Sequence, residues 1–222
     1  MTRWKKNSKS CHGPPEMSND AVYAAGLLNR ALDPTTQPAE IKEFLDAEYR
    51  LLRTLIASRM RVIDIGSGTG RHLLALQDRL ALGFGLDYER NYIAEARRRS
   101  PAHVHFVTAD ATAIPAPAMF DAAVCLTNSW GTMSDKPGVL REMRRVAPRR
   151  GTRLLSVYSP ASISPRRRWY RRLGHTVVAE TGEYLESDGG FRSEHFTHAR
   201  LRDLVGECSI EPLTPIAFAV LF

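Results

Sequence analysis

Val-Ile-Asp-Ile-Gly-Ser-Gly-Thr-Gly, residues 62–70, is the stretch that decides the fold of this 222-residue chain. A short β-branched run at 61–65 ends at the glycines, and a helical pattern follows over 69–80. Glycines let the backbone pass close to a ligand, and the start of a helix presents unpaired N–H groups to it. The stretch therefore predicts a strand, a tight turn and a helix that together bind a ligand.

The spacing of the glycines argues against two common nucleotide sites. A dinucleotide fingerprint is GxGxxG, but here Gly66 and Gly68 are followed by Gly70, and Arg71 stands where the third glycine would be. No Gly-Lys-Ser/Thr follows, as a phosphate-binding P-loop requires. The stretch therefore disfavours an NAD, FAD or P-loop nucleotide site.

Strands and helices alternate on the carboxyl side of this stretch. Apolar runs predict strands, and amphipathic spacing predicts helices. The expected strands lie at 82–86, 104–108, 122–126 and 152–158, and the expected helices at 89–99 and 136–146. This alternation predicts a parallel sheet built of right-handed crossovers.

The alternation breaks after Ser159. A basic helix is expected at 164–172, and runs separated by glycines in 176–196 predict short antiparallel strands. Such an insertion would lie beyond the carboxyl ends of the parallel strands, where ligands bind in open α/β sheets. A last helix is expected at 196–206, and the final one or two strands at 210–222.

The amino-terminal part and the composition predict the domain organisation and the class of protein. We expect residues 1–20 to be a disordered polar tail and 21–222 a single domain, with a helical cap at 21–58 and a substrate-side insertion at 165–196. The three cysteines lack CxxC spacing, so we expect neither disulfides nor a metal site. No 18 apolar residues run together, which predicts a soluble, cytoplasmic protein without a membrane partner.

The positive charge is local. The net charge is +7, but residues 141–172 contain eleven arginines and one acid, so the rest of the chain is slightly negative. A local positive field suggests one anionic partner, such as a phosphate, a carboxylate or RNA. A solvated arginine-rich helix and loop is the alternative interpretation.

The chain resembles the class I S-adenosylmethionine-dependent methyltransferases over about 38–158. The resemblance consists of the DxGxGxG turn at 64–70, Asp87 at the end of the next strand, Asp110 after the third, and Phe-Asp before the strand at 122–126. The stretch 140–157 matches the helix, glycine turn and strand that usually follow. The fold class expected is α/β: a Rossmann-like three-layer sandwich with a mostly parallel seven-stranded sheet and a short antiparallel insertion after the fifth strand.

The resemblance implies S-adenosyl-L-methionine as the cofactor and assigns roles to individual residues. Asp87 would accept the ribose hydroxyl hydrogens, and Asp110 with the Ala111 N–H would meet the adenine edge. Asn128, Ser129 and Trp130 would leave the fourth strand beside the methyl group and line both cofactor and substrate. The expected cofactor-binding residues are Asp64, Gly66, Ser67, Gly68, Gly70, Asp87, Tyr88, Asp110, Ala111 and Asn128.

The sulfonium of this cofactor already activates its methyl group, so the protein need only align an acceptor with it. A base would help, and the candidates are His175, Glu183, Glu194 and His195. Among them we favour His195, because an imidazole titrates near neutrality, and the stronger alternative for this residue is a helix-start or packing role. Trp130, Arg167, Trp169 and Tyr184 are expected to contact the substrate, with the arginine holding an anionic part of it.

The sequence leads to one main hypothesis and two alternatives. The main hypothesis is methyl transfer to an oxygen or nitrogen of a small molecule or short peptide, with natural-product biosynthesis as one setting. An RNA or protein methyltransferase that uses the arginine-rich segment 141–172 is the first alternative. The second is a non-catalytic binding protein on the same fold, which the acids at 64, 87 and 110 disfavour.

Overall fold

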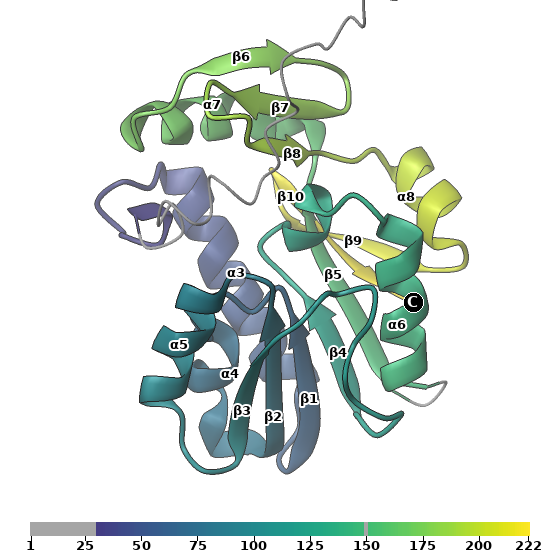
Figure 1. Cartoon of the computed structure of the whole chain (residues 1–222). Helices are drawn as coiled ribbons and strands as arrows, with labels where there is room; N and C mark the ends of the chain where they lie inside the picture. The colour runs from purple at the N-terminus through teal and green to yellow at the C-terminus, as the bar shows by residue number, and fades with distance from the viewer. Residues whose placement is uncertain (1–29, 149–150) are drawn as a thin grey trace, which may run out of the picture.

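A computed structural model describes residues 30–148 and 151–222 of the chain (Figure 1). The tail expected at 1–20 and the first part of the expected helical cap lie outside the described residues. The described part contains a seven-stranded sheet and a separate three-stranded sheet. No helix within these ranges is both long and apolar enough to cross a lipid bilayer.

The seven-stranded sheet has the order β3-β2-β1-β4-β5-β10-β9. Its strands are β1 (Met60–Ile65), β2 (Leu80–Asp87), β3 (Val104–Thr108), β4 (Ala122–Cys125), β5 (Thr152–Tyr158), β9 (Ser209–Thr214) and β10 (Ala217–Leu221). Strands β1 to β5 pair in parallel, whereas β10 runs antiparallel between β5 and β9. The expected mostly parallel, seven-stranded Rossmann-like sheet is therefore confirmed.

Helices cover both faces of this sheet, which makes three layers (Figure 1). One face carries α3 (Ala39–Leu55), α4 (Arg71–Ala75) and α5 (Arg90–Arg99), and the other α6 (Lys136–Val146) and α8 (His198–Val205). Each face has its own apolar cluster, because the amphipathic helices turn their apolar stripes toward the sheet. The helix expected at 69–80 is shorter than the pattern suggested. It ends at Ala75, and a 3₁₀ turn, η1 (Gln77–Arg79), follows.

The segment after β5 forms the expected antiparallel insertion. A short turn, η3 (Pro160–Ser162), leads into α7 (Ile163–Arg172), which precedes β6 (Val177–Glu180), β7 (Tyr184–Ser187) and β8 (Arg192–Glu194), paired in the order β6-β7-β8. The insertion packs on the amino-terminal half of α3 through a third apolar cluster, which includes Phe44, Trp169 and Leu185. Helix α3 thus joins the main sheet to the insertion.

Candidate active site

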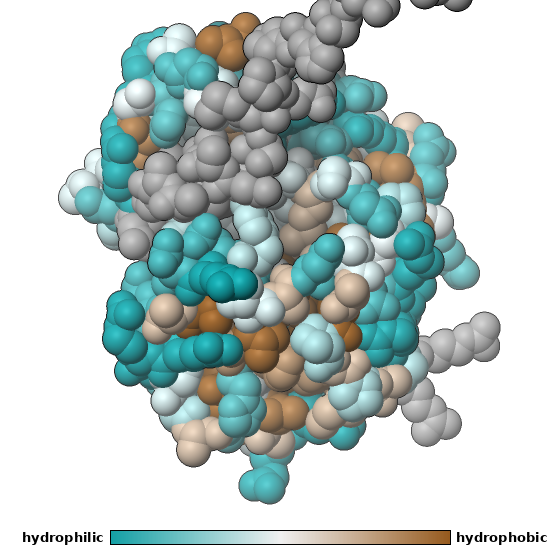
Figure 2. Space-filling view, viewed as in Figure 1, coloured by the Kyte–Doolittle hydropathy of each residue, from teal (hydrophilic) through white to brown (hydrophobic). Residues whose placement is uncertain are grey.

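A cavity of about 650 Å³ opens at the carboxyl ends of β1 to β4. Parallel strands bring their carboxyl ends to one edge, so side chains that follow different strands meet there. Figure 2 shows apolar residues near the centre of this face with hydrophilic side chains around them. The expected site residues that line the cavity are Gly66, Ser67, Gly68, Asp87, Tyr88, Asp110 and Ala111.

The glycine turn is shaped by left-handed backbone and by bonds to the neighbouring strand. Gly66 and Gly68 have φ values of 73° and 53°, which glycine adopts without strain. The Gly66 and Ser67 N–H groups both donate to the Leu86 carbonyl at 2.9 Å. The Gly68 N–H donates to Asp87 Oδ2 at 2.9 Å. The turn and the end of β2 therefore form one wall of the cavity.

Gly70 does not line the cavity, and its expected role in cofactor binding stays a prediction. It adopts φ 81°, and a Cβ atom there would lie 2.4 Å from Phe106 Cζ. Glycine is needed at this position because α4 begins in close contact with the aromatic ring of β3. Its contribution is to packing behind the turn.

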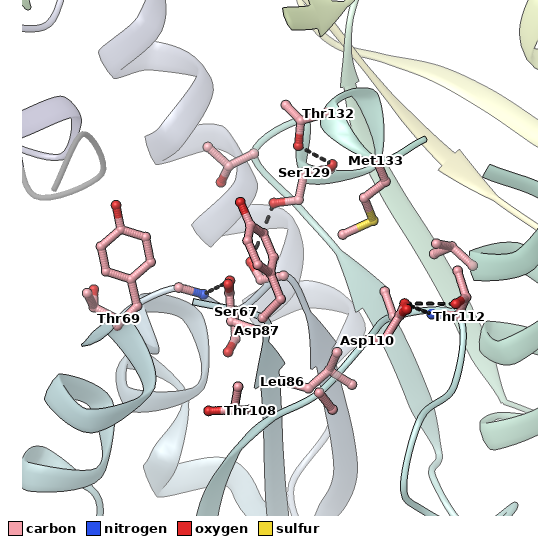
Figure 3. A pocket seen from close by; sticks show the side chains of 18 of the residues that line it. Ser67, Thr69, Leu86, Asp87, Thr108, Asp110, Thr112, Ser129, Thr132 and Met133 are labelled. Carbon is pink, nitrogen blue, oxygen red and sulfur yellow. Dashed lines mark hydrogen bonds between the residues drawn. The ribbon is translucent and has the colours of Figure 1, made fainter. Parts of the chain in front are cut away.

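Asp87 and Asp110 face the same cavity from two adjacent strands (Figure 3). The half-buried Asp87 carboxylate accepts the Gly68 N–H and, at 3.0 Å, the Glu89 N–H. Burial raises the pKa of Asp87 despite these two hydrogen bonds. Asp110 is exposed, and its Oδ1 accepts the Thr112 N–H and hydroxyl at 2.7 and 2.8 Å. Asp110 is thus oriented by its own loop, and Asp87 by its own loop and by the glycine turn after β1.

Two buried polar atoms near the turn have no hydrogen-bond partner among the residues that the structure describes. They are Asp64 Oδ1 and Ser67 Oγ. Asp64 is 1% exposed and lies behind the wall, with its Oδ2 at 3.3 Å from His72 Nδ1. Buried polar groups are almost always paired, so these atoms indicate a place for a polar ligand or water. Ser67 lines the cavity and fits a polar ligand at the glycine turn, whereas Asp64, an expected cofactor-binding residue, is not part of the cavity lining.

Glu48 is a functional candidate that the sequence reasoning missed. It comes from α3, is 1% exposed, and accepts the Thr127 N–H at 2.5 Å, the Thr127 hydroxyl at 2.9 Å and an Arg71 N–H at 2.9 Å. Burial alone would raise its pKa, but the nearby His72 ring, the Arg71 charge and the hydrogen bond from Ser156 outweigh burial and lower the pKa to about 2. An acid on the apolar stripe of an amphipathic helix was the signal available in the sequence.

The segment after β4 also lines the cavity, and of the three residues expected there Ser129 does so. Thr127, Ser129, Thr132 and Met133 face it from the β4 end and the turn η2 (Ser129–Thr132) (Figure 3). The Thr132 hydroxyl donates to the Ser129 carbonyl at 2.8 Å. This wall presents hydroxyl groups and one thioether to the cavity.

Asn128 and Trp130 are fully buried and do not line the cavity, which corrects both expectations. The Asn128 amide donates to Ser193 Oγ and the Glu194 carbonyl, each at 3.1 Å, and its Oδ1 accepts the Tyr158 N–H. Trp130 stacks on Phe196 with 5.1 Å between ring centroids. These side chains fasten the insertion to the β4 end, so their contribution to the site is structural.

His195 does not lie at the cavity, which corrects its expected role as a base. The ring is 1% exposed, and its Nδ1 lies 2.9 Å from Nη2 of Arg166, also fully buried. Burial and then the Arg166 charge lower the pKa of His195 to about 4. A neutral imidazole enclosed by the insertion cannot reach an acceptor in the cavity.

The other expected substrate residues also lie away from the cavity lining. Trp169 is buried in the cluster shared with α3, and Tyr184 packs under the Arg192 guanidinium at 3.6 Å from the ring centroid. Arg167 forms an exposed ion pair with Glu180. No residue of the insertion lines the cavity in the part of the chain that is described. The expected substrate contacts of Arg167, Trp169 and Tyr184 are therefore wrong for this cavity.

The described arginines of 141–172 do not form a single face. Arg145 bonds Glu142 and two carbonyls beside α6, whereas Arg166 is buried in the insertion. Arg168 pairs with Glu40 of α3, and Arg153 bonds the Phe222 carbonyl. Helices α6 and α7 lie at separate places on the molecule (Figure 1). The charge that is concentrated in the sequence is dispersed and largely paired in space.

Comparisons with known proteins agree with this architecture. Residues 62–151 match a family described as a methyltransferase domain. The structure of a DhpI complex with SAH has a TM-score of 0.65 at 19% identity, and the match covers 93% of this chain and 96% of that one. The PH0226 protein of Pyrococcus horikoshii has a TM-score of 0.64 at 18% identity, covering 86% of this chain and 95% of that one.

A third solved structure, an S-adenosylmethionine-dependent methyltransferase from Mesorhizobium loti, has a TM-score of 0.58 at 16% identity. The match covers 79% of this chain and 98% of that one. At these identities the solved structures show a shared fold. The comparison with curated proteins found no match.

Proposed function

We propose that this chain, a class I S-adenosylmethionine-dependent methyltransferase, transfers a methyl group to an oxygen or nitrogen of a small molecule or short peptide. The methyltransferase-domain match over 62–151 supports the class of enzyme, and the similar solved structures named for S-adenosylmethionine and SAH support the cofactor. We propose, in addition, the class of acceptor and the residues that contact the cofactor and the acceptor.

The cavity wall offers partners for each part of the cofactor. Asp87, at the end of β2, would accept the ribose hydroxyls, and Asp110 with the Ala111 N–H would meet the adenine edge. The unpaired Ser67 Oγ would bond a polar group at the glycine turn. The residues present therefore fit the polar groups of S-adenosylmethionine.

The cofactor supplies a methyl group that its sulfonium has already activated. The protein's own task is to hold the acceptor lone pair in line and to keep water away. Orientation of two reactants can contribute up to roughly 7 to 11 kcal/mol. Thr127, Ser129 and Thr132 would position the acceptor through their hydroxyls, while Met133 adds an apolar contact.

The size of the cavity is the observation that favours a small acceptor. Its volume of about 650 Å³ falls within the range of about 300 to 1,000 Å³ typical of small-molecule sites. Cofactor and acceptor would share this space, which leaves room for only a small group beside the cofactor. A metabolite or the end of a short peptide meets this limit, and natural-product biosynthesis is one setting for it.

The arrangement of the arginines disfavours the RNA alternative. Binding to a nucleic-acid backbone needs several unpaired cations along one surface. Here Arg167 and Arg168 are paired with glutamates, Arg166 is buried, and none of the three lines the cavity. The same dispersion removes the main support for an anionic acceptor held by this segment.

A labelled-methyl assay tests the proposal. The protein would be incubated with methyl-labelled cofactor and, separately, with a small-molecule extract, total RNA and a protein extract. We expect label in the small-molecule fraction and none with Asp87→Ala. Label that enters RNA or large proteins instead, with a rate that falls steeply with salt, would contradict the proposed acceptor class.

A further inference from the structure

Four charged or titratable side chains meet at one side of the cavity. Arg71 and His72 line it, and Glu48 and Asp64 lie buried behind them. The His72 ring lies between two carboxylates, with Nδ1 at 3.3 Å from Asp64 Oδ2 and Nε2 at 3.7 Å from Glu48 Oε2. The group brings together α3, β1 and the start of α4.

The contact between Arg71 and His72 fixes the state of the imidazole in this arrangement. Arg71 Nη2 lies 2.7 Å from His72 Nε2. A guanidinium only donates hydrogen bonds, so Nε2 must accept and cannot carry a proton. The ring is then neutral, with its single proton on Nδ1, where it is donated to Asp64. The hydrogen-bond pattern assigns this tautomer.

A second proton on His72 would change the contacts of Arg71. A protonated Nε2 donates and can no longer accept from Arg71, and its nearest carboxylate partner is Glu48 at 3.7 Å. Arg71 Nη2, which also donates to Glu48 and to the Thr127 hydroxyl at 2.9 and 3.1 Å, would lose the ring as an acceptor. The imidazole and the guanidinium would then share Glu48, and like charges would push Arg71 away from the ring.

We propose that His72 is a positioning residue: it holds Arg71 in the cavity wall when neutral and releases it when protonated, which couples cofactor binding to one proton. The inference rests on the cofactor occupying this cavity and is independent of the acceptor. It gives His72 a role at the site even though His72 cannot serve as the base, because its Nδ1 and Nε2 both face protein groups.

The surrounding charges favour protonation of His72. Burial and the Arg71 charge oppose it, but bonds to Asp64 and Glu48 outweigh them and raise the pKa of His72 above its ordinary 6.5. The neutral hydroxyls of Thr127 and Ser156 pack against Glu48 from the β4 end and β5. Asp87 of β2 and Cys125 of β4 lie near Asp64, and burial raises the pKa of both.

The proton also changes the net charge beside the cofactor. With His72 neutral, the two carboxylates and Arg71 sum to −1, and with His72 protonated the group is neutral. A sulfonium cation gains from the negative state, whereas S-adenosylhomocysteine carries no sulfonium and gains less. The affinity for S-adenosylmethionine relative to S-adenosylhomocysteine should therefore increase as pH rises through the His72 pKa.

Calorimetry of both ligands across pH 5.5 to 9 tests the inference. In the wild type we expect the ratio Kd(S-adenosylmethionine)/Kd(S-adenosylhomocysteine) to fall about 5-fold with one inflection, the lower end of typical coupling between sites. His72→Gln should remove the inflection. Glu48→Gln should move it to lower pH, because one of the two carboxylates that raise the His72 pKa is lost.

Glu43→Gln is the matched control, because Glu43 lies on the same helix but is exposed. It should leave the inflection in place. If Glu48→Gln or His72→Gln fails to fold, ring-nitrogen NMR of the wild type gives the same test and should show the proton on Nδ1 at high pH. A flat ratio in the wild type, an inflection that survives His72→Gln, or a proton on Nε2 at high pH would overturn the inference.

Discussion

The carboxyl edge of the main sheet and the insertion at 163–194 use similar residues for different purposes. At the edge, Asp87 and Asp110 face a cavity from adjacent strands. In the insertion, Arg166 and His195 are buried against each other, and neither lines that cavity. A polar or aromatic residue therefore indicates a functional site when the sheet topology fixes its position. When only contacts with distant parts of the chain fix its position, the residue mainly contributes to packing.

Arg166 illustrates the second case. Its guanidinium lies 4.8 Å above the Tyr158 ring and donates to the Ser193 carbonyl and hydroxyl at 3.0 Å. These contacts fasten α7 and β8 to the end of β5. A run of arginines that suggests an anion site in the sequence instead includes the residue that holds the insertion together.

The largest difference in stability between the two regions should come from substituting one glycine in each of them. Gly70→Ala at the edge should lower the free energy of unfolding by about 2 to 4 kcal/mol, because φ is 81° and the new Cβ would lie 2.4 Å from Phe106 Cζ. Gly182→Ala in the insertion should change it by less than about 0.5 kcal/mol, because nothing described lies within 4 Å of its Cβ. Urea unfolding of both variants measures the contrast.

Equal losses of unfolding free energy for the two glycine substitutions would contradict the close packing described at Gly70. A large loss in Gly182→Ala alone would mean that the insertion is packed more tightly than the edge. Cofactor affinity of folded Gly70→Ala is a second readout, and it should fall because α4 and the glycine turn would shift together.

His195→Gln should separate stability from catalysis. Loss of the buried contact with Arg166 should cost about 1 to 2 kcal/mol of unfolding free energy at pH 7.5, while kcat/KM changes less than about 3-fold. A catalytic base would instead show a large loss of kcat with a changed pH profile. Steady-state kinetics and urea unfolding of the same preparation decide between the two.

The pH dependence of stability gives an independent check on His195. Its folded pKa is lowered to about 4 from 6.5, so below about pH 6.5 the unfolded chain binds a proton that the folded chain does not. Stability should therefore fall by about 1 to 2 kcal/mol between pH 7 and 5 through this residue. His195→Gln should show a smaller fall, and an unchanged fall would contradict the buried neutral imidazole.

The smallest effect is expected for the double variant Arg167→Gln with Arg171→Gln. The exposed pair of Arg167 with Glu180 should contribute no more than about 0.5 kcal/mol. Neither arginine lines the cavity, so the Michaelis constant of the acceptor should stay within about 2-fold. A rise of 10-fold or more in this Michaelis constant would indicate that the insertion contacts the substrate.

The sequence predicted the fold because its signals are local. Alternating strands and helices predicted the parallel sheet. Acids at strand ends predicted that Asp87 and Asp110 lie at the site, since the carboxyl ends of parallel strands all lie at one edge of such a sheet. Glu48 was missed because its partners Thr127 and Ser156 lie 79 and 108 residues away in the chain. Asn128 was misplaced because its left-handed backbone, φ 57°, turns the side chain toward the insertion.

Binding of S-adenosylmethionine to the wild type and to Asp87→Ala tests the central claim most directly. Asp87 is the acid that joins the glycine turn to the end of β2, and its loss should weaken binding about 10- to 150-fold, equivalent to about 1.5 to 3 kcal/mol. Calorimetry should show this loss, with a smaller one for the exposed Asp110→Ala. Equal affinity of the wild type and Asp87→Ala, or no binding by a folded wild type, would contradict the account.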